Sequence, residues 1–378
     1  MRLGFDGKRA TQNFRGLGNY SRGIIEGLLQ YSSEELFLYS PPVKNDRAVN
    51  WLESQKSPKL HLREPKGFIS KAAPSLWRSY SINNDLKKDH LDLYHGLSHE
   101  IPYAVNSSVR KSTVTMHDLI FMRYPEFFPL IDRMTYKRKF TYACKQADQV
   151  IAICEQTKRD LIEFLNVDEK KIVIHYQSCD PFFYEKREFH EIKDFMRKHQ
   201  FERPFILNVG AFEERKNQLA LIEAFALASH KIEQDLVLIG SGKAYLEECK
   251  ALVEKLKITN RVRFLSNIPF AELPLFYQAA DLFCFPSHFE GFGLPIVEAL
   301  FSQTPVITSF GSCFPESAGP DSVYVDPKSI KDISDKIVQV LGDVNLQETM
   351  ISKSYEFVQR FHRKQVTHNL LECYSRLF

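Results

Sequence analysis

The chain has 378 residues, of which 44% are hydrophobic and 26% are charged, and its formal net charge is +3. That length accommodates two domains of ordinary size, and the composition is normal for a soluble globular protein. No apolar run approaches the ~18 residues of a membrane span, and the N-terminal M-R-L-G-F-D-G-K-R lacks an apolar signal segment. The seven cysteines form no C-x-x-C, so we expect reduced structural thiols in a cytoplasmic protein.

Short β-branched or aromatic runs alternate with helical patterns along the first half of the chain. Strands are expected at residues 3–5, 36–39, 91–95, 112–116, 149–153 and 172–175. Helices are expected at residues 19–30, 133–146 and 155–165. The charged segment 180–204 is poor in β formers, and we interpret it as an interdomain connection with a helix.

The second half repeats the alternation. Strands are expected at residues 205–209, 236–239, 262–265, 282–285, 305–308 and 323–325. Helices are expected at residues 217–228, 244–256, 270–278, 295–301, 330–342 and 345–358, and one more amphipathic helix is expected over 359–378. Strands separated by helices of this length predict parallel sheets, so the sequence predicts two doubly wound α/β domains. Ligands of such folds bind outside the carboxyl ends of the strands, and the cleft between two domains is the expected site.

The most informative segment is F-P-S-H-F-E-G-F-G-L-P-I-V-E at residues 285–298. Glu290 and Glu298 bracket a turn that contains Gly291 and Gly293 and opens a helix near Leu294. Glycines let a ligand approach the backbone, and free N–H groups at a helix start attract a phosphate. Carboxylates accept hydrogen bonds from sugar hydroxyls. The segment therefore favours a nucleotide-sugar site, although an ordinary strand–turn–helix joint is the alternative.

Three other segments end a strand or begin a helix with polar or glycine residues. Arg215 and Lys216 follow the strand at 205–209, where two cations suit a diphosphate, although a solvated helix start is the alternative. His117 and Asp118 follow the strand at 112–116 and form either a structural pair or part of a site. The segment G-L-G-N-Y at residues 16–20 is a weak G-x-G signal, because a plain loop-to-helix joint needs no function.

E-G-F-G-L-P-I-V-E resembles the E-x7-E signature of the retaining GT-B glycosyltransferases of family 4. G-L-G-N-Y, H-D and E-R-K-N match the family in the same order, so the resemblance covers essentially the whole chain. It implies the GT-B fold: two Rossmann-like domains with parallel sheets facing across a cleft, and a C-terminal helix that crosses back. Residues 1–180 with 359–378 would be the acceptor-binding domain, and residues 203–358 the nucleotide-sugar-binding domain.

The resemblance also implies roles for individual residues. Catalytic roles fall on His117, Arg215, Lys216 and Glu290. Donor-binding roles fall on Gly16, Gly18, Asp118, Gly210, Gly240, Asn267, Ile268, Gly291, Phe292, Gly293, Leu294 and Glu298. In the family the Arg–Lys pair stabilises the departing diphosphate, the first glutamate binds the donor sugar and the second binds the ribose. Some members carry another arginine where this chain has Ala211, which puts a third phosphate cation in doubt.

The motifs are most similar to those of bacterial mannosyltransferases that build capsule or O-antigen chains. The resemblance thus implies transfer of a hexose with retention, from GDP-mannose as first expectation or a UDP-sugar as second, to a saccharide or lipid-linked saccharide. The chain has no D-x-D pair, so we expect neither a metal nor another cofactor. The alternatives are a soluble enzyme that acts on a small acceptor and a non-catalytic nucleotide-sugar-binding protein.

Two stretches are rich in basic residues. Residues 44–88 contain ten Lys or Arg and four acids, interleaved with Phe68, Ile69, Leu76, Trp77 and Tyr80, and residues 133–139 read R-M-T-Y-K-R-K. Such stretches form either a solvated face or a contact with an anionic membrane surface. Nucleic acid is disfavoured because no nucleic-acid-binding module is recognised. We expect a cytoplasmic protein, with a peripheral position on the inner face of the cytoplasmic membrane as one alternative.

Overall fold

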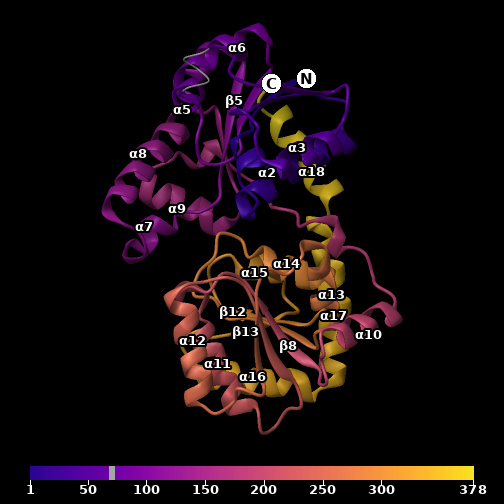
Figure 1. Ribbon diagram of the computed structural model, residues 1–378. Helices are drawn as coiled ribbons and strands as arrows, with labels where there is room; N and C mark the ends of the chain where they lie inside the picture. Colours follow the sequence, from indigo (N-terminus) through magenta and orange to yellow (C-terminus); the bar gives the residue numbers. More distant parts are fainter. Residues whose placement is uncertain (68–72) are drawn as a thin grey trace. The chain divides into compact units, whose positions relative to one another are not determined.

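The computed structural model describes residues 1–67 and 73–378, which divide into two compact units (Figure 1). The first unit contains Met1–Ser178 and His362–Phe378, and the second contains Cys179–Phe361. The segment expected to connect two domains therefore belongs to the second unit from Cys179 onward. Its helix α10 (Phe189–Lys198) packs there through Phe195, whose ring meets that of Phe276 edge-on at 4.7 Å.

The first unit is built on a parallel sheet. Its described residues form seven strands in the order β3-β2-β1-β4-β5-β6-β7. The strands are β1 (Arg2–Asp6), β2 (Glu35–Tyr39), β3 (Leu60–Arg63), β4 (Leu93–Gly96), β5 (Lys111–Met116), β6 (Gln149–Ala152) and β7 (Ile172–Ile174). The helices are α1 (Lys8–Gln12), α2 (Gly16–Tyr31), α3 (Asp46–Ser54), α5 (Pro74–Leu76), α6 (Asn83–Lys88), α7 (Ile120–Arg123), α8 (Leu130–Gln146), α9 (Glu155–Leu165) and α18 (Arg363–Ser375).

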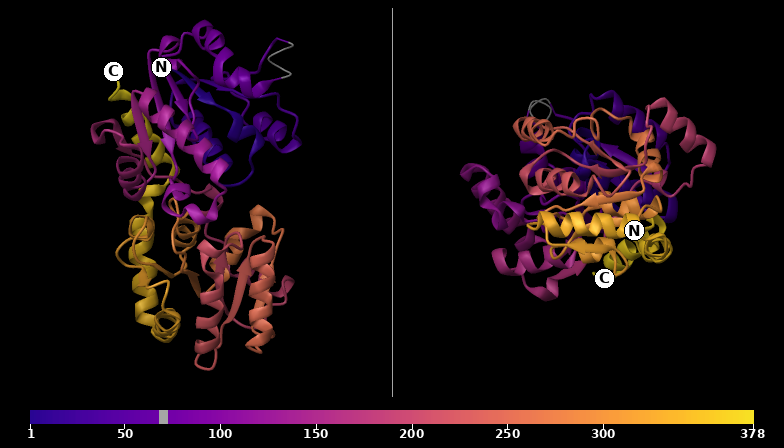
Figure 2. Two further views of the ribbon diagram at one scale, coloured as in Figure 1. Left: turned by 90° about the vertical axis from the view of Figure 1, so that its left-hand side faces the viewer. Right: turned by 90° about the horizontal axis from the view of Figure 1, so that it is seen from below.

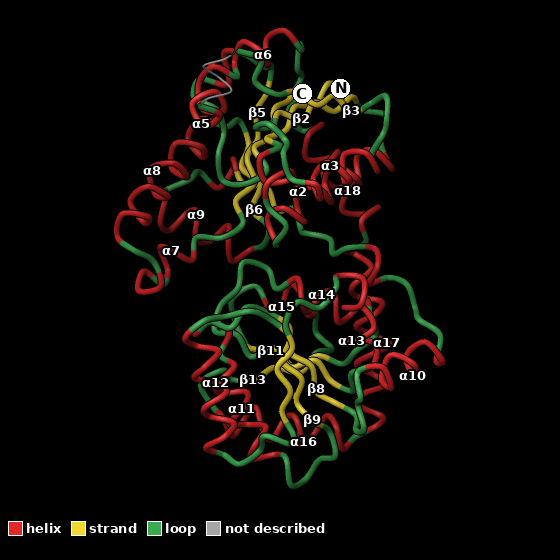
Figure 3. Tube along the Cα trace, viewed as in Figure 1, coloured by secondary structure: helices red, strands yellow, loops and turns green. Residues whose placement is uncertain are grey.

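Apolar side chains cover both faces of this sheet, as expected for parallel strands buried on both sides. Leu3 and Phe5 point to the face covered by α2 and α18. Val114 and Met116 of β5 belong to the opposite core, with α8 and α9. Figure 3 shows the strands of each unit at its centre with helices around them.

The C-terminal helix α18 completes the first unit. Three hydrogen bonds fix it to the sheet: the Tyr374 hydroxyl lies 2.7 Å from His95 Nδ1, His175 Nε2 lies 2.8 Å from the Val366 carbonyl oxygen, and Gln149 Nε2 donates to the Cys373 carbonyl. The expected single helix over 359–378 is interrupted, because His362 has an extended backbone between a short 3₁₀ turn at Gln359–Phe361 and α18. The chain crosses between the units at that residue.

The second unit is also a doubly wound parallel sheet. Its strand order is β10-β9-β8-β11-β12-β13 in the part of the chain that the structure describes. The strands are β8 (Phe205–Val209), β9 (Asp235–Ile239), β10 (Val262–Leu265), β11 (Leu282–Phe285), β12 (Val306–Ser309) and β13 (Val323–Val325). The other helices are α11 (Gln218–Ala228), α12 (Ala244–Lys255), α13 (Leu273–Ala279), α14 (Leu294–Phe301), α15 (Phe314–Ala318), α16 (Ile330–Gly342) and α17 (Val344–Val358).

The sequence missed the edge strand β3 and several short helices. β3 reads L-H-L-R, pairs only with β2 among the described strands and is only partly buried. An edge strand with alternating polar residues lacks the continuous apolar run by which the buried strands are recognised. The short helices α1 and α7 have five and four residues, too few to show a helical period.

Substitutions at two glycines of α2 can test how closely α18 packs against that helix. A Cβ on Gly27 would lie 2.3 Å from Thr367 Oγ1, whereas a Cβ on Gly23, one turn earlier, would come no closer than 3.9 Å to Arg363. We expect Gly27→Ala to lower the free energy of unfolding by about 1–3 kcal/mol through overpacking. Gly23→Ala should instead be neutral or stabilising by up to about 1 kcal/mol, because alanine is the better helix former. Urea denaturation of both variants measures this, and equal effects would contradict the close packing.

Candidate active site

In each sheet the strand order reverses beside the first strand, between β1 and β4 in the first unit and between β8 and β11 in the second. Doubly wound folds bind ligands in the crevice at the carboxyl ends of such a strand pair. In the second unit, Arg215 and Lys216 belong to a 3₁₀ turn (Glu214–Lys216) that follows β8. Glu290 follows β11, so residues distant in sequence meet at this point.

Arg215, Lys216 and Glu290 form a compact group, which we call the cation–carboxylate cluster. Glu290 Oε2 lies 2.8 Å from Arg215 Nη1, and Glu290 Oε1 lies 2.7 Å from Lys216 Nζ. Ser287 Oγ donates a further hydrogen bond to Glu290 Oε1 at 3.2 Å. Burial alone would raise the pKa of Glu290, but Lys216 and Arg215 hold it down at about 2. The carboxylate is therefore ionised at neutral pH and pairs with both cations.

Further contacts hold both cations in place. Arg215 also pairs with Glu213 and donates to the Phe289 carbonyl, and Lys216 Nζ lies 5.0 Å from the centre of the Phe285 ring. The next residue, Asn217, has a left-handed backbone with φ of 61°, and its amide donates to the Pro286 and Pro327 carbonyls. This asparagine thereby ties the turn after β8 to the loop after β11.

Two glycines allow the loops after β8 and β9 to touch. A Cβ on Gly240 would lie 1.9 Å from the Gly210 carbonyl oxygen. A Cβ on Gly210 would in turn lie 3.1–3.3 Å from the end of the Lys216 side chain. Neither position has room for a larger residue unless its neighbours move, so both glycines serve the close packing beside the cluster.

The helix α14 begins directly after the glycine turn. Gly293 has φ of 86°, a conformation that favours glycine, and Pro295 lies in the first helical turn, where a missing N–H costs nothing. Leu294 is the first helical residue, one earlier than expected. Phe292 is 3% exposed and its ring meets Phe361 edge-on at 5.4 Å, so its side chain packs in the core.

Glu298 lies on α14 one turn into the helix and has a hydrogen-bond partner that sequence reasoning missed. The Tyr277 hydroxyl, from α13, donates to Glu298 Oε2 at 2.9 Å. Burial raises the pKa of Glu298 to about 7, and the hydrogen bond from Tyr277 opposes that shift. Tyr277 lies in an apolar run, where nothing in the sequence distinguishes it from an ordinary core residue.

His117 and Asp118 directly follow β5 in the first unit. His117 Nε2 lies 2.9 Å from the Leu97 carbonyl oxygen, which only accepts, so Nε2 carries the proton. Gln177 Nε2 lies 3.4 Å from Nδ1, and the Tyr20 ring meets the imidazole edge-on at 4.6 Å. Burial lowers the pKa of His117 to about 4, so the imidazole is neutral at physiological pH. Asp118 accepts a hydrogen bond from the Ile120 amide.

The remaining predicted site residues are glycines or loop residues. Gly16 is exposed with open space around its Cβ position, whereas a Cβ on Gly18 would lie 1.7 Å from the Asn13 carbonyl oxygen. Asn267 is exposed with φ of 56°, and Ile268 and Gly291 are partly buried. Gly16 and Gly18 lie on α2, the helix that brings Tyr20 against His117.

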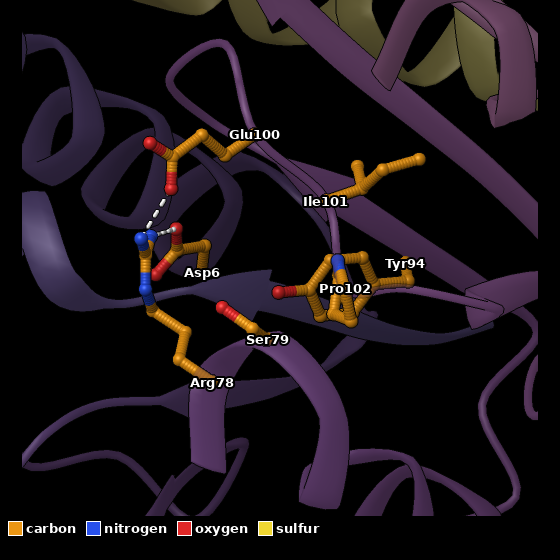
Figure 4. A pocket seen from close by; sticks show the side chains of 7 residues that line it. All are labelled: Asp6, Arg78, Ser79, Tyr94, Glu100, Ile101 and Pro102. Atoms are coloured by element: carbon orange, nitrogen blue, oxygen red, sulfur yellow. Dashed lines mark hydrogen bonds and ion pairs between the residues drawn. The ribbon is translucent and has the colours of Figure 1, made fainter. Parts of the chain in front are cut away.

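A small polar pocket lies at the strand-order reversal of the first sheet (Figure 4). Arg78 pairs there with Asp6, the last residue of β1, at 2.7 Å, and also with Glu100. Tyr94 of β4 is 1% exposed, and its hydroxyl points toward this pair without a hydrogen-bond partner among the described residues. The volume of about 20 Å³ holds one water or one ligand hydroxyl group.

Comparisons with known proteins identify the family. The pattern of Glycosyl transferases group 1 matches residues 191–357, and that of Glycosyltransferase Family 4 matches residues 20–181. The chain belongs to the family 4 glycosyltransferases. It is 26% identical over 373 residues to O-antigen chain mannosyltransferase B of Escherichia coli, with 96% of each chain covered. It is 28% identical over 314 residues to O-antigen chain mannosyltransferase RfbU of Salmonella typhimurium, with 80% of each covered.

Solved structures confirm the expected GT-B fold of this glycosyltransferase. HepE of Anabaena in complex with UDP and glucose superposes with a TM-score of 0.80 at 19% identity over 100% of both chains. WaaG, a glycosyltransferase involved in lipopolysaccharide biosynthesis, superposes with a TM-score of 0.71 at 16% identity, covering 97% of this chain and 98% of WaaG.

Within residues 1–67 and 73–378, no group of three or more His, Cys, Asp or Glu side chains is arranged to hold a metal ion. None of the helices in the same residues is both long and apolar enough to cross a bilayer.

The cation–carboxylate cluster makes Glu290 important for stability. We expect Glu290→Gln to lower the free energy of unfolding by about 3 kcal/mol near pH 7, because the nearly buried Lys216 loses its carboxylate partner and Arg215 loses one of its two. The folded pKa lies below the ordinary value of 4.5, so this contribution is present above that value and lost as pH falls toward 2. Urea denaturation at several pH values measures the difference in free energy of unfolding between the wild type and Glu290→Gln. Glu254→Gln, at an exposed position, is the matched control. If the difference between the wild type and Glu290→Gln persists at acidic pH, it does not come from the ionised Glu290 carboxylate.

Glu298 should have the opposite pH dependence. Its folded pKa lies above the ordinary value, so its contribution to stability is complete at acidic pH and is lost as pH rises through about 7. Glu298→Gln should therefore gain about 2 kcal/mol over the wild type near pH 8 and nothing near pH 5. Tyr277→Phe removes the hydrogen bond that favours the ionised form of Glu298. In this variant the loss of stability with rising pH should therefore occur at a higher pH than in the wild type. If the free energies of unfolding of the wild type and Glu298→Gln differ by the same amount at both pH values, the raised pKa of Glu298 is refuted.

Proposed function

We propose that this glycosyltransferase moves a hexosyl group from a nucleoside diphosphate sugar to a saccharide hydroxyl, with retention at the anomeric carbon. The cation–carboxylate cluster at the strand-order reversal of the second sheet is the observation that carries the proposal. Two fixed cations at the carboxyl ends of β8 and β11 suit a diphosphate, which is doubly negative or more.

Each member of the site has a proposed part in the reaction. Arg215 and Lys216 neutralise the charge that develops on the departing diphosphate, with the free N–H groups of α14 beside the glycine turn. Glu290 accepts hydrogen bonds from the donor sugar hydroxyls, and Glu298 accepts them from the ribose. Tyr277 holds one oxygen of Glu298, so the other oxygen and the remaining lone pairs are available to the ligand.

The proposed reaction makes one bond and breaks another. The acceptor oxygen forms a bond to the anomeric carbon while the bond from that carbon to the phosphate oxygen breaks. The departing phosphate takes the acceptor proton, so no protein carboxylate serves as a nucleophile, in contrast with retaining hydrolases. A neutral His117, whose Nε2 proton is donated to the Leu97 carbonyl, is proposed to accept a hydrogen bond at Nδ1 from a hydroxyl of the transferred sugar, and it does not carry the proton between substrates.

The relatives support a more specific substrate proposal. Two of them are named O-antigen chain mannosyltransferases, and at 26–28% identity they favour mannose as the transferred hexose. GDP-mannose is the first choice of donor and a UDP-sugar the second, since a fold neighbour was solved with UDP and glucose. The proposed acceptor is a lipid-linked saccharide in cell-surface polysaccharide synthesis, bound by the first unit. The pocket beside Tyr94 has room for one acceptor hydroxyl.

We also propose that the donor site works without a metal. The chain lacks a D-x-D pair, and Arg215 and Lys216 already supply two cations at the place where the diphosphate is expected. The proposed place of action is the cytoplasm, where sugar nucleotides are made available to such enzymes.

A thermal-shift panel tests the donor site. Nucleosides, nucleoside diphosphates and their sugars are compared with and without EDTA, and a ligand at a hundredfold excess over its Kd should stabilise the fold by about 2.7 kcal/mol. We expect one base to dominate, and its diphosphate to raise the melting temperature equally with EDTA present. Loss of the shift in EDTA would overturn metal independence, and no shift with any nucleotide would overturn the donor site.

Two variants separate the phosphate and ribose contacts. Lys216→Met should remove most of the shift given by the diphosphate and leave that of the nucleoside unchanged. Lys255→Met, at an exposed position on α12, is the matched control and should behave as wild type. In a turnover assay with the donor so identified, Glu298→Ala should lower the rate by at least about a hundredfold, or 2.7 kcal/mol. Binding without any turnover by the wild type would favour a non-catalytic protein.

A further inference from the structure

Side chains of the first basic stretch, at residues 44–88, serve the fold. Lys59 donates to two backbone carbonyls, and Trp77 is buried. Phe68 and Ile69 of that stretch lie outside the described residues. The fold thus accounts for Lys59 and Trp77, but it leaves one histidine on the turn after β4 only partly explained.

This turn folds back tightly at the carboxyl end of β4. A Cβ on Gly96 would lie 2.1 Å from the Glu100 carbonyl oxygen, so a larger residue would not fit unless the turn moved. Within the turn, His99 has φ of 63°, a left-handed backbone that is uncommon outside glycine. Its backbone N–H donates to the Thr115 carbonyl at 2.9 Å, which fixes the turn to β5. Residues held in such sparsely populated conformations cluster at binding sites.

The His99 imidazole lies beside two other rings of the first unit. It stacks on Phe140 of α8, with the ring centres 4.4 Å apart and an angle of 8° between the planes. The centre of the His117 ring lies 5.1 Å from it. Figure 1 shows α8 at the left of the first unit, and the left view of Figure 2 looks onto that side. Because His99 is only 8% exposed, its ring is held in one place beside a proposed site residue.

The two nitrogens of His99 have different surroundings. Nδ1 is buried and has no hydrogen-bond partner among the described residues. Nε2 has none in that part of the chain either, but it is not buried. The proton is better placed on Nε2, where a ligand or solvent can accept it, than on Nδ1, where it would be buried without an acceptor. Burial lowers the pKa of His99 well below its usual range, and His117 and Arg9 add to that shift, so the ring is neutral.

The neighbouring imidazole offers the complementary group. The Nε2 proton of His117 is donated to the Leu97 carbonyl at 2.9 Å, so Nδ1 is an acceptor. Gln177 Nε2 lies 3.4 Å from this Nδ1, which is longer than an ordinary hydrogen bond, so a ligand group can take its place. One imidazole therefore presents a donor, and the other presents an acceptor.

A hydroxyl is the substrate group that suits this pair of rings. It donates one hydrogen bond and accepts others at a single oxygen, whereas an ether or carbonyl oxygen only accepts. An oxygen that is hydrogen-bonded to an imidazole nitrogen lies about 4 Å from the ring centre. Two rings whose centres are 5.1 Å apart can therefore share one hydroxyl.

We propose that His99 is a specificity-determining residue, whose Nε2–H donates to the same hexose hydroxyl from which His117 Nδ1 accepts. The inference deepens the proposed function and rests on it for the identity of the ligand as a nucleotide-linked hexose. A hexose without this hydroxyl would leave both nitrogens unpaired, so the site discriminates against it. The residue sets which hexose is accepted and takes no part in moving the proton of the acceptor.

Calorimetric titration of the full chain tests the proposal without an acceptor. The probes are GDP, GDP-mannose and analogues of GDP-mannose that each lack one hexose hydroxyl, or the UDP and UDP-glucose series if UDP gives the thermal shift. We expect one analogue to bind the wild type about tenfold more weakly than the complete sugar nucleotide, because its hydrogen bonds to the two imidazoles are lost.

Variants assign this discrimination to His99. His99→Phe keeps a ring to stack on Phe140 and removes the N–H donor. It should bind GDP like the wild type, bind GDP-mannose about tenfold more weakly, and show no further loss with the analogue that the wild type rejects. If the phenylalanine variant does not fold, His99→Asn replaces it, because asparagine tolerates the left-handed backbone and its amide is too short to reach the place of Nε2. His61→Phe, at another histidine stacked on a phenylalanine, is the matched control and should bind every probe normally.

The outcomes separate this inference from the proposed function. Equal weakening of GDP and GDP-mannose by the His99 variants would indicate a structural role and overturn the proposal, and so would unchanged binding of GDP-mannose. If the wild type binds no nucleotide, the donor site of the proposed function is overturned as well. Nucleotide binding with unaltered hexose discrimination in the variants overturns the role of His99 alone.

NMR of the protein with isotope-labelled histidine gives an independent readout. Long-range proton–nitrogen spectra, assigned with the His99 variants, should show a protonated Nε2 and an unprotonated Nδ1 for His99 at neutral pH. A protonated Nδ1 would overturn the assignment of His99 as the donor, whatever the binding data show.

Discussion

The cation–carboxylate cluster is the interaction on which the second unit's site depends. Glu290 brings together a turn that follows β8 and a loop that follows β11, two segments that only the strand order makes neighbours. Three nearly buried charges require this arrangement, since any one of them left alone would carry a large desolvation penalty. The fold by itself therefore keeps two cations fixed in position, so a diphosphate would meet charges that are already ordered.

The two glutamates of one short motif have opposite electrostatic environments. Beside Arg215 and Lys216, Glu290 is ionised throughout the physiological range, whereas Glu298 is buried against a tyrosine and titrates near neutrality. Glu298 thus lowers the stability of the fold at alkaline pH, which is a typical compromise at a binding site. In the first unit, His117 is kept neutral mainly by burial, and its Nε2 proton is held by the Leu97 carbonyl, so its proposed role is to accept a hydrogen bond at Nδ1.

Completion of the first unit by α18 also constrains the site. The Tyr374 hydroxyl on α18 bonds His95, whose other nitrogen lies 2.7 Å from Thr115 Oγ1, and that oxygen lies 3.1 Å from the Tyr20 hydroxyl. Tyr20 then packs against His117. A buried polar network of this kind is stable only when its members are satisfied together. The end of the chain and the glycine-rich start of α2 are thereby linked to one candidate site residue.

The sequence by itself determined the alternation of buried strands and helices, the glycine turn before α14 and the family motifs, because these depend on local periodicity and on residues adjacent in the chain. It located β10, β11 and β13 at their observed bounds, but it missed β3, whose partial burial gives no continuous apolar run. Only the tertiary structure decided that Glu290 pairs with Arg215 and Lys216 and that the Tyr277 hydroxyl bonds Glu298. It also decided that Arg63 and Arg78 pair with carboxylates inside the first unit. Pairing across tens of residues depends on strand order and on side-chain packing, and neither leaves a local pattern in the sequence.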